Sequence, residues 1–460
     1  MFMKKFRILS VVLAAFLMLG LFSACNRGSS SKSGGADITT VRIWTNDAHN
    51  KDEYVKAVDA FNAGPGAAQG VKIEYTVFGG DYQTVCDVAI SADDEPEIYK
   101  ADPKIAQYIN MGKGQPLSNL PDFQAVLDEY APFQKEGLTM YDGKVYAIPL
   151  SQHVFAMAYN KDLLKRIGKT EPPRTWAEYE ADSIAISKLE PGKIFGHALP
   201  CKFSDYDEIQ LMNWVSQSTG HFQFDFTNGK YVFTDLIPFF EMFQRINVGG
   251  GTFPGIETLD DDTYRAQFAE GNIAFCFGGS WNVGVLYDQF PAKMDWGIAP
   301  QPVQDVNTVY NVPAIPGSLY VVSNQVKGDM LNKVAIVYKF LASKELRMAL
   351  FTGGKDIPVN PQIAIDAPPS ARPQWGEYGQ AGANAVLKPT LPDAYFNLEG
   401  RNKYQVFTEI VTGVSKPAEA LADLEKRYNE GLQKGIANGQ VKLADFLDPS
   451  IEGKFTYGRR

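Results

Sequence analysis

The chain has 460 residues, of which 45% are hydrophobic and 21% are charged, and this length is enough for two or three domains. The composition is that of a folded globular protein, and it excludes a disordered, a collagen-like or a multi-span membrane protein. Asp and Glu total 53 against 44 Lys and Arg, which gives a formal net charge of −9. Because such an acidic balance offers no basic surface to phosphates, we expect no nucleic-acid partner.

The N-terminal residues have the pattern of a secretory signal. Basic residues precede residues 8–22, which are almost wholly apolar and fall short of the about 20 residues that a membrane span needs. Small residues and then Cys25 follow, and this end resembles the lipobox of bacterial lipoproteins. The resemblance implies a signal peptide over residues 1–24 and lipidation of Cys25, which would attach the chain to a membrane. An uncleaved anchor helix is the alternative.

A short polar segment and three further cysteines follow the signal. Residues 26–37 are rich in Ser and Gly, so residues 25–40 are predicted to form a flexible tether. Cys86, Cys201 and Cys276 show no zinc-type spacing, and three cysteines allow at most one disulfide. We expect buried thiols.

Strands and helices alternate in the first part of the chain. Residues 41–45 form a predicted strand, and residues 52–63 form a helix with two acidic residues at its start. Residues 71–77 alternate between apolar and polar side chains, which is typical of a half-buried strand. A helix at residues 82–92 and a strand at residues 97–101 follow. This order predicts an α/β protein with a mostly parallel sheet.

The rest of the chain is more helical. Thr175 and Glu178 have the spacing of a capping box at a helix start. Apolar residues at helical spacing predict further helices at residues 205–218, 237–246, 264–270, 334–350 and 418–436. Pro417 opens the last of these helices, and Asn438-Gly439 closes it.

Catalytic and metal-binding motifs are missing from the sequence. Residues 168–170 have the tail of a P-loop without its upstream glycine, and no Gly-x-Ser-x-Gly elbow occurs. The chain has 4 histidines, none paired at metal-ligand spacing. The acidic residues 260–262 lack the glycine and glutamate of an EF-hand and indicate a solvated helix N-terminus. The sequence therefore predicts no metal site, and the lack of motifs is weak evidence against an enzyme.

The tryptophans indicate a different kind of site. Sugars present C–H-rich faces that stack on aromatic rings, and ligands of open α/β sheets bind beyond the carboxyl ends of strands. Trp44 and Trp281 both stand at such strand ends, so we expect them to contact ligand. Trp176 and Trp296 are expected in the core, and the sequence leaves Trp214 open.

Six motifs occur in a characteristic order along the chain. They lie at residues 142–149 with 159–163 (DGKVYAIP and YNKDL), 172–178 (PPRTWAE), 268–281 (FAEGNIAFCFGGSW), 296–300 (WGIAP), 317–322 (GSLYVV) and 413–421. Together they resemble the extracellular solute-binding proteins of ABC importers, and specifically the carbohydrate-binding family that includes maltose-binding protein. The resemblance extends over residues 41–440.

This resemblance implies a fold. It is the two-lobe α/β fold of type II periplasmic binding proteins, in which each lobe is a mostly parallel sheet flanked by helices and the ligand lies in the cleft between lobes. Residues 41–152 and 314–356 would form the first lobe. Residues 153–313 and 357–447 would form the second.

The resemblance also implies ligand contacts in the first lobe and at the lobe junction. Trp44 and Asn46 match the site after the first strand, and Asp102 matches a polar sugar contact after a later strand. His153 stands where a hydroxyl-binding carboxylate is common in the family. A buried, hydrogen-bonded histidine is the alternative interpretation of His153.

Further contacts are implied in the second lobe. Asp207 lies in a second-lobe contact region, and Trp281 matches the stacking tryptophan of the family. The family's late stacking aromatic is not found at its usual place. Tyr395 is our candidate for that role, with Phe396 and Trp375 as alternatives.

The implied function is that of a lipid-anchored receptor outside the cytoplasm. It would close around a sugar or oligosaccharide by hinge rotation and deliver this ligand to the permease subunits of an ABC importer. The resemblance implies a monomer without cofactor, metal or enzymatic activity. Two other classes stay open: a secreted lipoprotein hydrolase that acts on glycans, and an adhesin or scaffold without a closing cleft.

Overall fold

A computed structural model describes residues 38–454, apart from residues 79–80, 103, 204–205, 383–384 and 389. By its contacts the chain divides into Met1–Ile38 and Thr39–Arg460, and all that follows concerns the second unit. The predicted signal peptide (residues 1–24), Cys25 and most of the tether lie outside the described residues. None of the helices in the described part of the chain is long and apolar enough to span a membrane.

The first lobe is built on a sheet of order β2-β1-β3-β13-β4. Its strands are β1 (Thr39–Thr45), β2 (Val71–Val77), β3 (Ile98–Lys100), β4 (Gly114–Gln115) and β13 (Tyr320–Ser323). β1 runs parallel to β2 and β3, whereas β13 runs antiparallel to β3 and β4. Val71 and Ile73 are buried and Lys72 and Glu74 exposed, which confirms the alternation predicted for β2.

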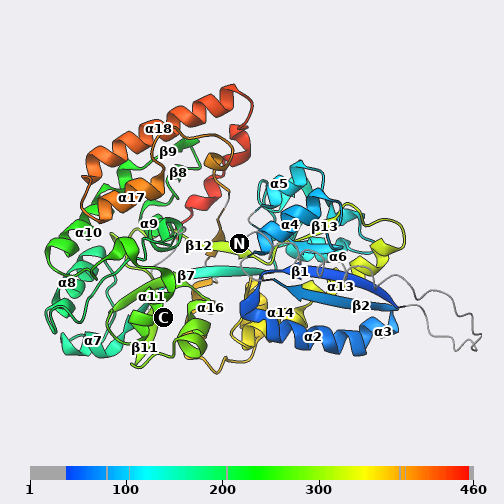
Figure 1. Ribbon diagram of the computed structural model, residues 1–460, viewed down its shortest axis with the longest axis horizontal. Coiled ribbons are helices and arrows are strands. Elements are labelled where there is room, and N and C mark those ends of the chain that lie inside the picture. The colour runs from blue at the N-terminus through cyan, green and yellow to red at the C-terminus, as the bar shows by residue number, and fades with distance from the viewer. Residues whose placement is uncertain are drawn as a thin grey trace, which may run out of the picture. The chain divides into compact units, whose positions relative to one another are not determined.

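Helices cover this first sheet. They are α2 (Lys51–Ala63), α3 (Pro65–Ala68), α4 (Tyr82–Ser91), α5 (Ile105–Asn110), α6 (Gln124–Tyr130), α13 (Met330–Ala342) and α14 (Lys344–Thr352). α2 packs against β2 and α13 against β1, so segments far apart in sequence share one core. Figure 1 shows these helices on both faces of the sheet.

The second lobe is built around one long strand, β7 (Ser151–Asn160). Its sheet has the order β10-β7-β12-β15, and β11 and β14 also pair with β7. The other strands are β10 (Phe275–Gly279), β11 (Trp296–Ala299), β12 (Val312–Gly317), β14 (Ile357–Pro358) and β15 (Ala385–Leu387). β7 is buried along nearly its whole length, and the helices α16 (Pro373–Gly382) and α9 (Asn213–Thr219) pack against it.

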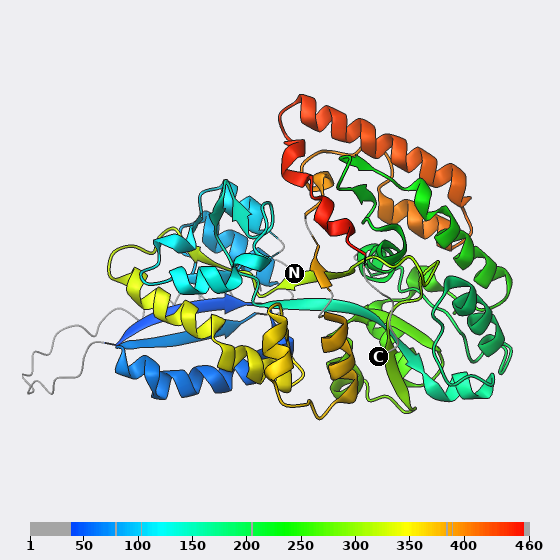
Figure 2. The same cartoon turned by 180° about the vertical axis from the view of Figure 1, so that it is seen from behind.

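The direction of these strands corrects one detail of the expected fold. A mostly parallel sheet was expected in each lobe. Among the described strands of the second sheet, however, those that pair with β7 all run antiparallel to it, and β12 with β15 is the only parallel pair. For β12 the reason is the path of the chain, visible from both sides in Figures 1 and 2: β7 leaves the first lobe and β12 returns to it. Strands that carry the chain out and back must pair antiparallel.

Helices also enclose the second lobe. They are α7 (Lys161–Arg166), α8 (Trp176–Ser187), α9 (Asn213–Thr219), α10 (Ile237–Val248), α11 (Asp261–Ala269), α12 (Asn282–Gly284), α15 (Pro361–Asp366), α16 (Pro373–Gly382), α17 (Lys403–Val411) and α18 (Pro417–Ala437). The remaining strands form two short hairpins. β5 (Met140–Tyr141) pairs with β6 (Lys144–Val145), and β8 (Phe224–Asp225) pairs with β9 (Lys230–Tyr231). The two-lobe α/β architecture that the sequence predicts is thus present, while the predicted lobe boundaries stay a prediction.

Local sequence signals account for several helix ends. Thr175 accepts a hydrogen bond from the Glu178 amide, and the full capping box is formed. Asp260 accepts from the Thr263 amide at 2.8 Å, which confirms a helix start at the acidic run. The helix predicted at residues 205–218 begins as a π-helical turn, η4 (Asp207–Met212), and continues as α9.

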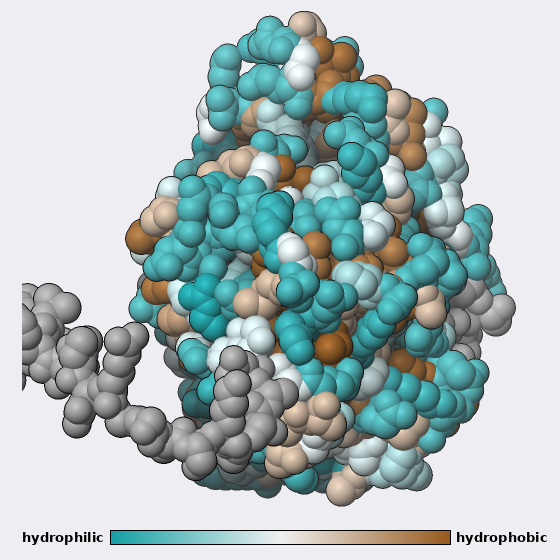
Figure 3. Space-filling view, turned by 90° about the vertical axis from the view of Figure 1, so that its right-hand side faces the viewer, coloured by the Kyte–Doolittle hydropathy of each residue, from teal (hydrophilic) through white to brown (hydrophobic). Residues whose placement is uncertain are grey.

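The structure confirms the expected burial of the thiols and of Trp176 and Trp296. Cys86, Cys201 and Cys276 are free and buried. Trp176, Trp214 and Trp296 lie in the core, with exposed fractions of 6%, 0% and 6%. Hydrophilic side chains cover most of the face in Figure 3, with apolar ones in small groups, as expected of a surface in contact with water.

Candidate functional site

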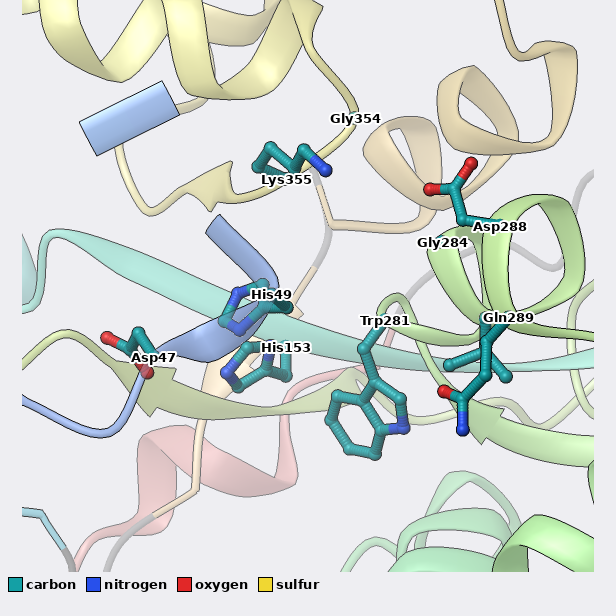
Figure 4. A pocket seen from close by; sticks show the side chains of 10 residues that line it. Asp47, His49, His153, Trp281, Gly284, Asp288, Gln289, Gly354 and Lys355 are labelled. Atoms are coloured by element: carbon teal, nitrogen blue, oxygen red, sulfur yellow. The ribbon is translucent and has the colours of Figure 1, made fainter. Parts of the chain in front are cut away.

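A cavity of about 460 Å³ lies where the two lobes meet, and both lobes line it. The first lobe contributes Asp47 and His49, which follow β1 directly. His153 on β7 and Trp281 beyond β10 lie opposite, and Lys355 precedes β14. In Figure 4 the two imidazoles lie beside each other, between Asp47 and the Trp281 ring. This arrangement is the expected one, because ligands bind beyond the carboxyl ends of strands.

Asp47 offers an oxygen to this cavity. Its Oδ1 accepts a hydrogen bond from Lys100 Nζ at 2.5 Å, and its backbone amide donates to Thr45 Oγ1 at 3.1 Å. Its Oδ2 is buried and has no hydrogen-bond partner among the described residues. A buried carboxylate oxygen without a partner costs free energy, and a ligand hydroxyl could supply the missing donor.

Lys100 joins the predicted polar residues of the first lobe. Its Nζ donates to Asn46 Oδ1 at 3.1 Å and lies 3.2 Å from Asp102 Oδ2, in addition to its contact with Asp47. Burial alone would lower the pKa of Lys100, but the charges of Asp102 and Asp47 outweigh burial and raise it. Lys100 therefore stays charged and holds three oxygen-bearing side chains around one ammonium group.

His49 connects the cavity to a buried carboxylate. Its Nε2 lies 3.0 Å from Asp356 Oδ1, and Asn50 Nδ2 donates to Asp356 Oδ2 at 3.0 Å. Arg347 NH1 lies 3.9 Å from the same carboxylate and its NH2 donates to Tyr54 Oη at 2.6 Å. Burial would raise the pKa of Asp356, but the hydrogen bond from His49 and the surrounding positive charges lower it to about 2. Asp356 is therefore ionised throughout the neutral range.

His153 and Trp281 form the floor of the cavity. The two rings meet edge to face, with centroids 5.1 Å apart, and Phe155 packs against Trp281 in the same way at 5.7 Å. Gly279 has no side chain here because a Cβ would approach the indole to 2.3 Å. Burial, and then the charge of His49, lower the pKa of His153 to about 4, so its imidazole is neutral at pH 7.

The far wall of the cavity carries further polar groups. Asp288 lies in the π-helical turn η7 (Val285–Gln289) and pairs with Arg372 NH2 at 2.8 Å. Lys355 lines the cavity and makes no ion pair with any described residue. None of the described His, Cys, Asp and Glu side chains cluster in a way that could hold a metal ion. The site is thus suited to binding a polar ligand through an aromatic face and hydrogen bonds.

The structure brings only some of the predicted site residues to this cavity. His153 and Trp281 line it. Asn46 and Asp102 lie next to it, bound to Lys100. Trp44 packs edge-on against Phe78, with ring centroids 5.0 Å apart, and does not line the cavity.

The predicted second-lobe contacts lie elsewhere. Asp207 is buried in η4. Tyr395 packs against Phe446 and lines a separate cavity of about 410 Å³. Its alternatives Phe396 and Trp375 are core residues, with exposed fractions of 8% and 1%.

Sequence reasoning missed Asp47, His49 and Lys355. Asp47 belongs to the polar run after the first strand, so its position gave a usable signal. His49 comes two residues later and its partner Asp356 is 307 positions away, so no local pattern connects them. Lys355 faces the cavity only because α14 ends just before it.

The chain is similar to a known family of proteins. The family described as bacterial extracellular solute-binding protein matches residues 56–376. A putative binding protein of Brucella abortus is 24% identical over 56% of this chain and 59% of its own length. The maltotriose-binding protein of Pyrococcus abyssi is 25% identical over 68% of this chain and 65% of its own. Both matches thus span less than two thirds of the relative.

Solved structures share the fold. The GacH receptor of Streptomyces glaucescens, solved without ligand and with acarbose, has a TM-score of 0.66 at 19% identity and covers 86% of this chain and 99% of its own. The maltose/maltodextrin-binding domain MalE of Bdellovibrio bacteriovorus, bound to maltotriose, has a TM-score of 0.60 at 18% identity, over 87% of this chain and 100% of its own. These likenesses confirm the predicted two-lobe fold.

Proposed function

Since the chain belongs to the family of bacterial extracellular solute-binding proteins, we propose that it captures a sugar or short oligosaccharide in the cavity between its lobes. The observation that carries this proposal is the pairing of an aromatic face, Trp281, with the unpartnered Oδ2 of Asp47 across one cavity. A sugar ring needs both, because its C–H face stacks on an aromatic ring and its hydroxyls donate to carboxylates. The names of the maltotriose-binding relative and of the acarbose-bound receptor support this ligand class.

Binding would involve both lobes. Asp47 and His49 come from the first lobe and His153 and Trp281 from the second, so only a closed arrangement lets one ligand contact all four. Closure would exclude water, which strengthens each hydrogen bond to the sugar and lets stacking supply affinity. No step in this mechanism breaks a covalent bond.

A thermal-shift screen tests the ligand class. Neutral mono- and oligosaccharides, among them maltotriose and raffinose, are added to the mature protein. A ligand at 100 times its dissociation constant should stabilise the fold by about 2.7 kcal/mol. No shift with any sugar would contradict the proposal, and sugar cleavage detected by mass spectrometry would favour the hydrolase alternative.

We also propose that the protein acts outside the cytoplasm, held by a lipid on Cys25, and delivers its ligand to the permease of an ABC importer. The family supports the location, and the signal-like residues before Cys25 support the anchor. Cys25→Ala should abolish labelling by a radioactive fatty acid while Cys86→Ala, which changes a buried thiol, should not. A labelled Cys25→Ala protein would rule out this anchor.

A further inference from the structure

His49 contacts a buried carboxylate on one side and lines the cavity on the other. Its Nε2 faces the buried Asp356, while its side chain is 34% exposed and lines the cavity. We propose that Asp356 is a positioning residue that keeps the proton on His49 Nε2 and turns Nδ1 toward the ligand, so that Nδ1 donates to the ligand in acid and accepts from it in base. This inference rests on the proposed function, because it assumes that the ligand occupies this cavity.

The first step is the state of Asp356. Its two oxygens accept from His49 and Asn50, each at 3.0 Å, and the carboxyl side chain is 3% exposed. An ionised carboxylate can only accept hydrogen bonds, so the imidazole nitrogen that faces it must carry a hydrogen. His49 is therefore the Nε2–H tautomer when neutral.

The second step concerns the other nitrogen. Nδ1 of His49 makes no hydrogen bond to any described residue. With Nε2 committed to Asp356, Nδ1 is the polar atom that His49 can offer to a ligand in the cavity. Its role depends on protonation alone: the neutral ring accepts a hydrogen bond there and the imidazolium donates one.

The third step is which group titrates. Burial would lower the pKa of His49, but the hydrogen bond and charge of Asp356 and the charge of Asp47 outweigh it and raise this pKa above 6.5, against the opposing charge of Lys100. His153, 6.1 Å away between ring centroids, stays neutral because its pKa is lowered to about 4. Arg347 lies behind Asp356, and Lys355 lines the same cavity. Of the two neighbouring imidazoles, His49 therefore takes up its proton at the higher pH, because its pKa is raised and that of His153 is lowered.

The sign of the effect follows from hydrogen-bond strength. Below its raised pKa, His49 is a cation, and its Nδ1–H donates a charge-assisted hydrogen bond to a sugar oxygen. Such bonds are about twice as strong as neutral ones. Affinity should therefore fall about five- to tenfold as pH rises through the pKa of His49.

Nuclear magnetic resonance of the imidazoles tests the positioning without any ligand. The chain has only 4 histidines, so all ring signals can be resolved, and His49→Gln assigns those of His49. In the wild type we expect neutral His49 as the Nε2–H tautomer with a pKa above 6.5, and in Asp356→Asn a lower pKa. A neutral Nδ1–H tautomer in the wild type would overturn the proposal. This measurement uses the wild-type protein alone and does not depend on whether a variant folds.

The chain offers a matched control. Asp235 faces His221 Nε2 at 3.4 Å, so Asp235→Asn makes the same chemical change beside a different histidine. We expect it to leave the titration of His49 unchanged. If the pKa of His49 shifts equally in both variants, the net charge of the protein sets this pKa and the contact with Asp356 does not. This result would overturn the proposal.

Calorimetry with maltotriose and raffinose from pH 5.5 to 8 then tests the link to binding. Affinity should fall with pH in the wild type and stay level in His49→Gln. A wild-type affinity that does not change with pH would contradict the proposal that protonation of His49 strengthens its contact with the sugar. If neither sugar binds at any pH, the sugar proposal fails, whereas the tautomer and titration still decide whether Asp356 positions His49.

Discussion

Trp281 is a side chain for which affinity and stability can be separated. Its ring lies on the cavity rather than in the packed interior. We expect Trp281→Ala to lower sugar affinity about 5- to 150-fold, because stacking on an aromatic ring is worth roughly 1–3 kcal/mol by analogy with base stacking. Calorimetric titration measures the affinity, and the melting temperature should change little.

A core tryptophan provides the contrast. Trp176 is 6% exposed, and its Nε1 donates to the Pro302 carbonyl oxygen at 3.0 Å. Trp176→Ala should cost about 3–5 kcal/mol of unfolding free energy. If Trp281→Ala instead behaves like Trp176→Ala, with unchanged affinity and a collapsed melting temperature, Trp281 is a core residue.

His197 makes the fold sensitive to acid. It is 1% exposed and its Nδ1 lies 2.7 Å from Tyr179 Oη. Burial lowers its pKa from 6.5 to about 3. As pH falls, the unfolded chain therefore takes up a proton at this histidine at a higher pH than the folded chain does. The unfolding free energy should therefore decrease as pH falls from 6.5 toward 3, by about 1.4 kcal/mol per pH unit from this group.

Denaturant titrations at several pH values measure this slope. His197→Gln removes the titrating group and should make the slope less steep. Tyr179→Phe removes only the hydrogen bond, so it should lower stability by about 1 kcal/mol at every pH and keep the slope. Equal slopes in the wild type and in His197→Gln would show that other groups cause the acid sensitivity.

At the scale of elements, one predicted helix is in fact two. The periodicity of residues 334–350 predicts a continuous helix, but α13 ends at Ala342 and α14 begins at Lys344. Ser343 between them is extended, with φ −61° and ψ 141°, and its side chain accepts from the Leu346 amide. A serine that caps a new helix ends the previous one.

This cap should contribute measurably to stability. Ser343→Ala removes the acceptor for the Leu346 amide, so we expect a loss of about 1 kcal/mol of unfolding free energy. Ser343→Asp keeps an acceptor and should be close to the wild type. Chemical denaturation measures both variants, and equal losses would show that the hydroxyl is not acting as a cap.

At the scale of the molecule, two polar contacts join the lobes. Lys135 Nζ lies 2.5 Å from Asp448 Oδ2, and Thr390 Oγ1 donates to the Gly137 carbonyl oxygen at 3.1 Å. In the segment that follows β12, the backbone of Ser318 is strained. Its φ of 54° lies in the left-handed region, which residues with a side chain rarely adopt. A non-glycine residue in this region persists only where its surroundings hold it.

The lobes should close on the ligand. We expect the chain to pass between lobes near residues 150–155, 313–318 and 356–360, and only the closed state lets both lobes contact one sugar. Small-angle scattering should therefore show a smaller radius of gyration with a saturating sugar. An unchanged radius with bound sugar would favour a rigid scaffold or enzyme, and Trp281→Ala without bound sugar is the matched control.

The sequence by itself determined what depends on neighbours along the chain. The capping box of Thr175, the helix start at Asp260 and the alternation of β2 were all predicted, because each involves residues a few positions apart. The α/β class and the place of Trp281 after a strand also follow from local order. The family resemblance extended these signals to the two-lobe arrangement.

Only the tertiary structure decided which distant residues meet. The antiparallel pairing around β7 depends on the path of the whole chain, and a strand's own residues do not specify its partner's direction. His49 and Asp356 are 307 positions apart, and Trp44 lies against Phe78 rather than on the cavity. Burial and charge at such contacts arise from packing, so the pKa values of His49 and His153 move in opposite directions although the two rings are neighbours.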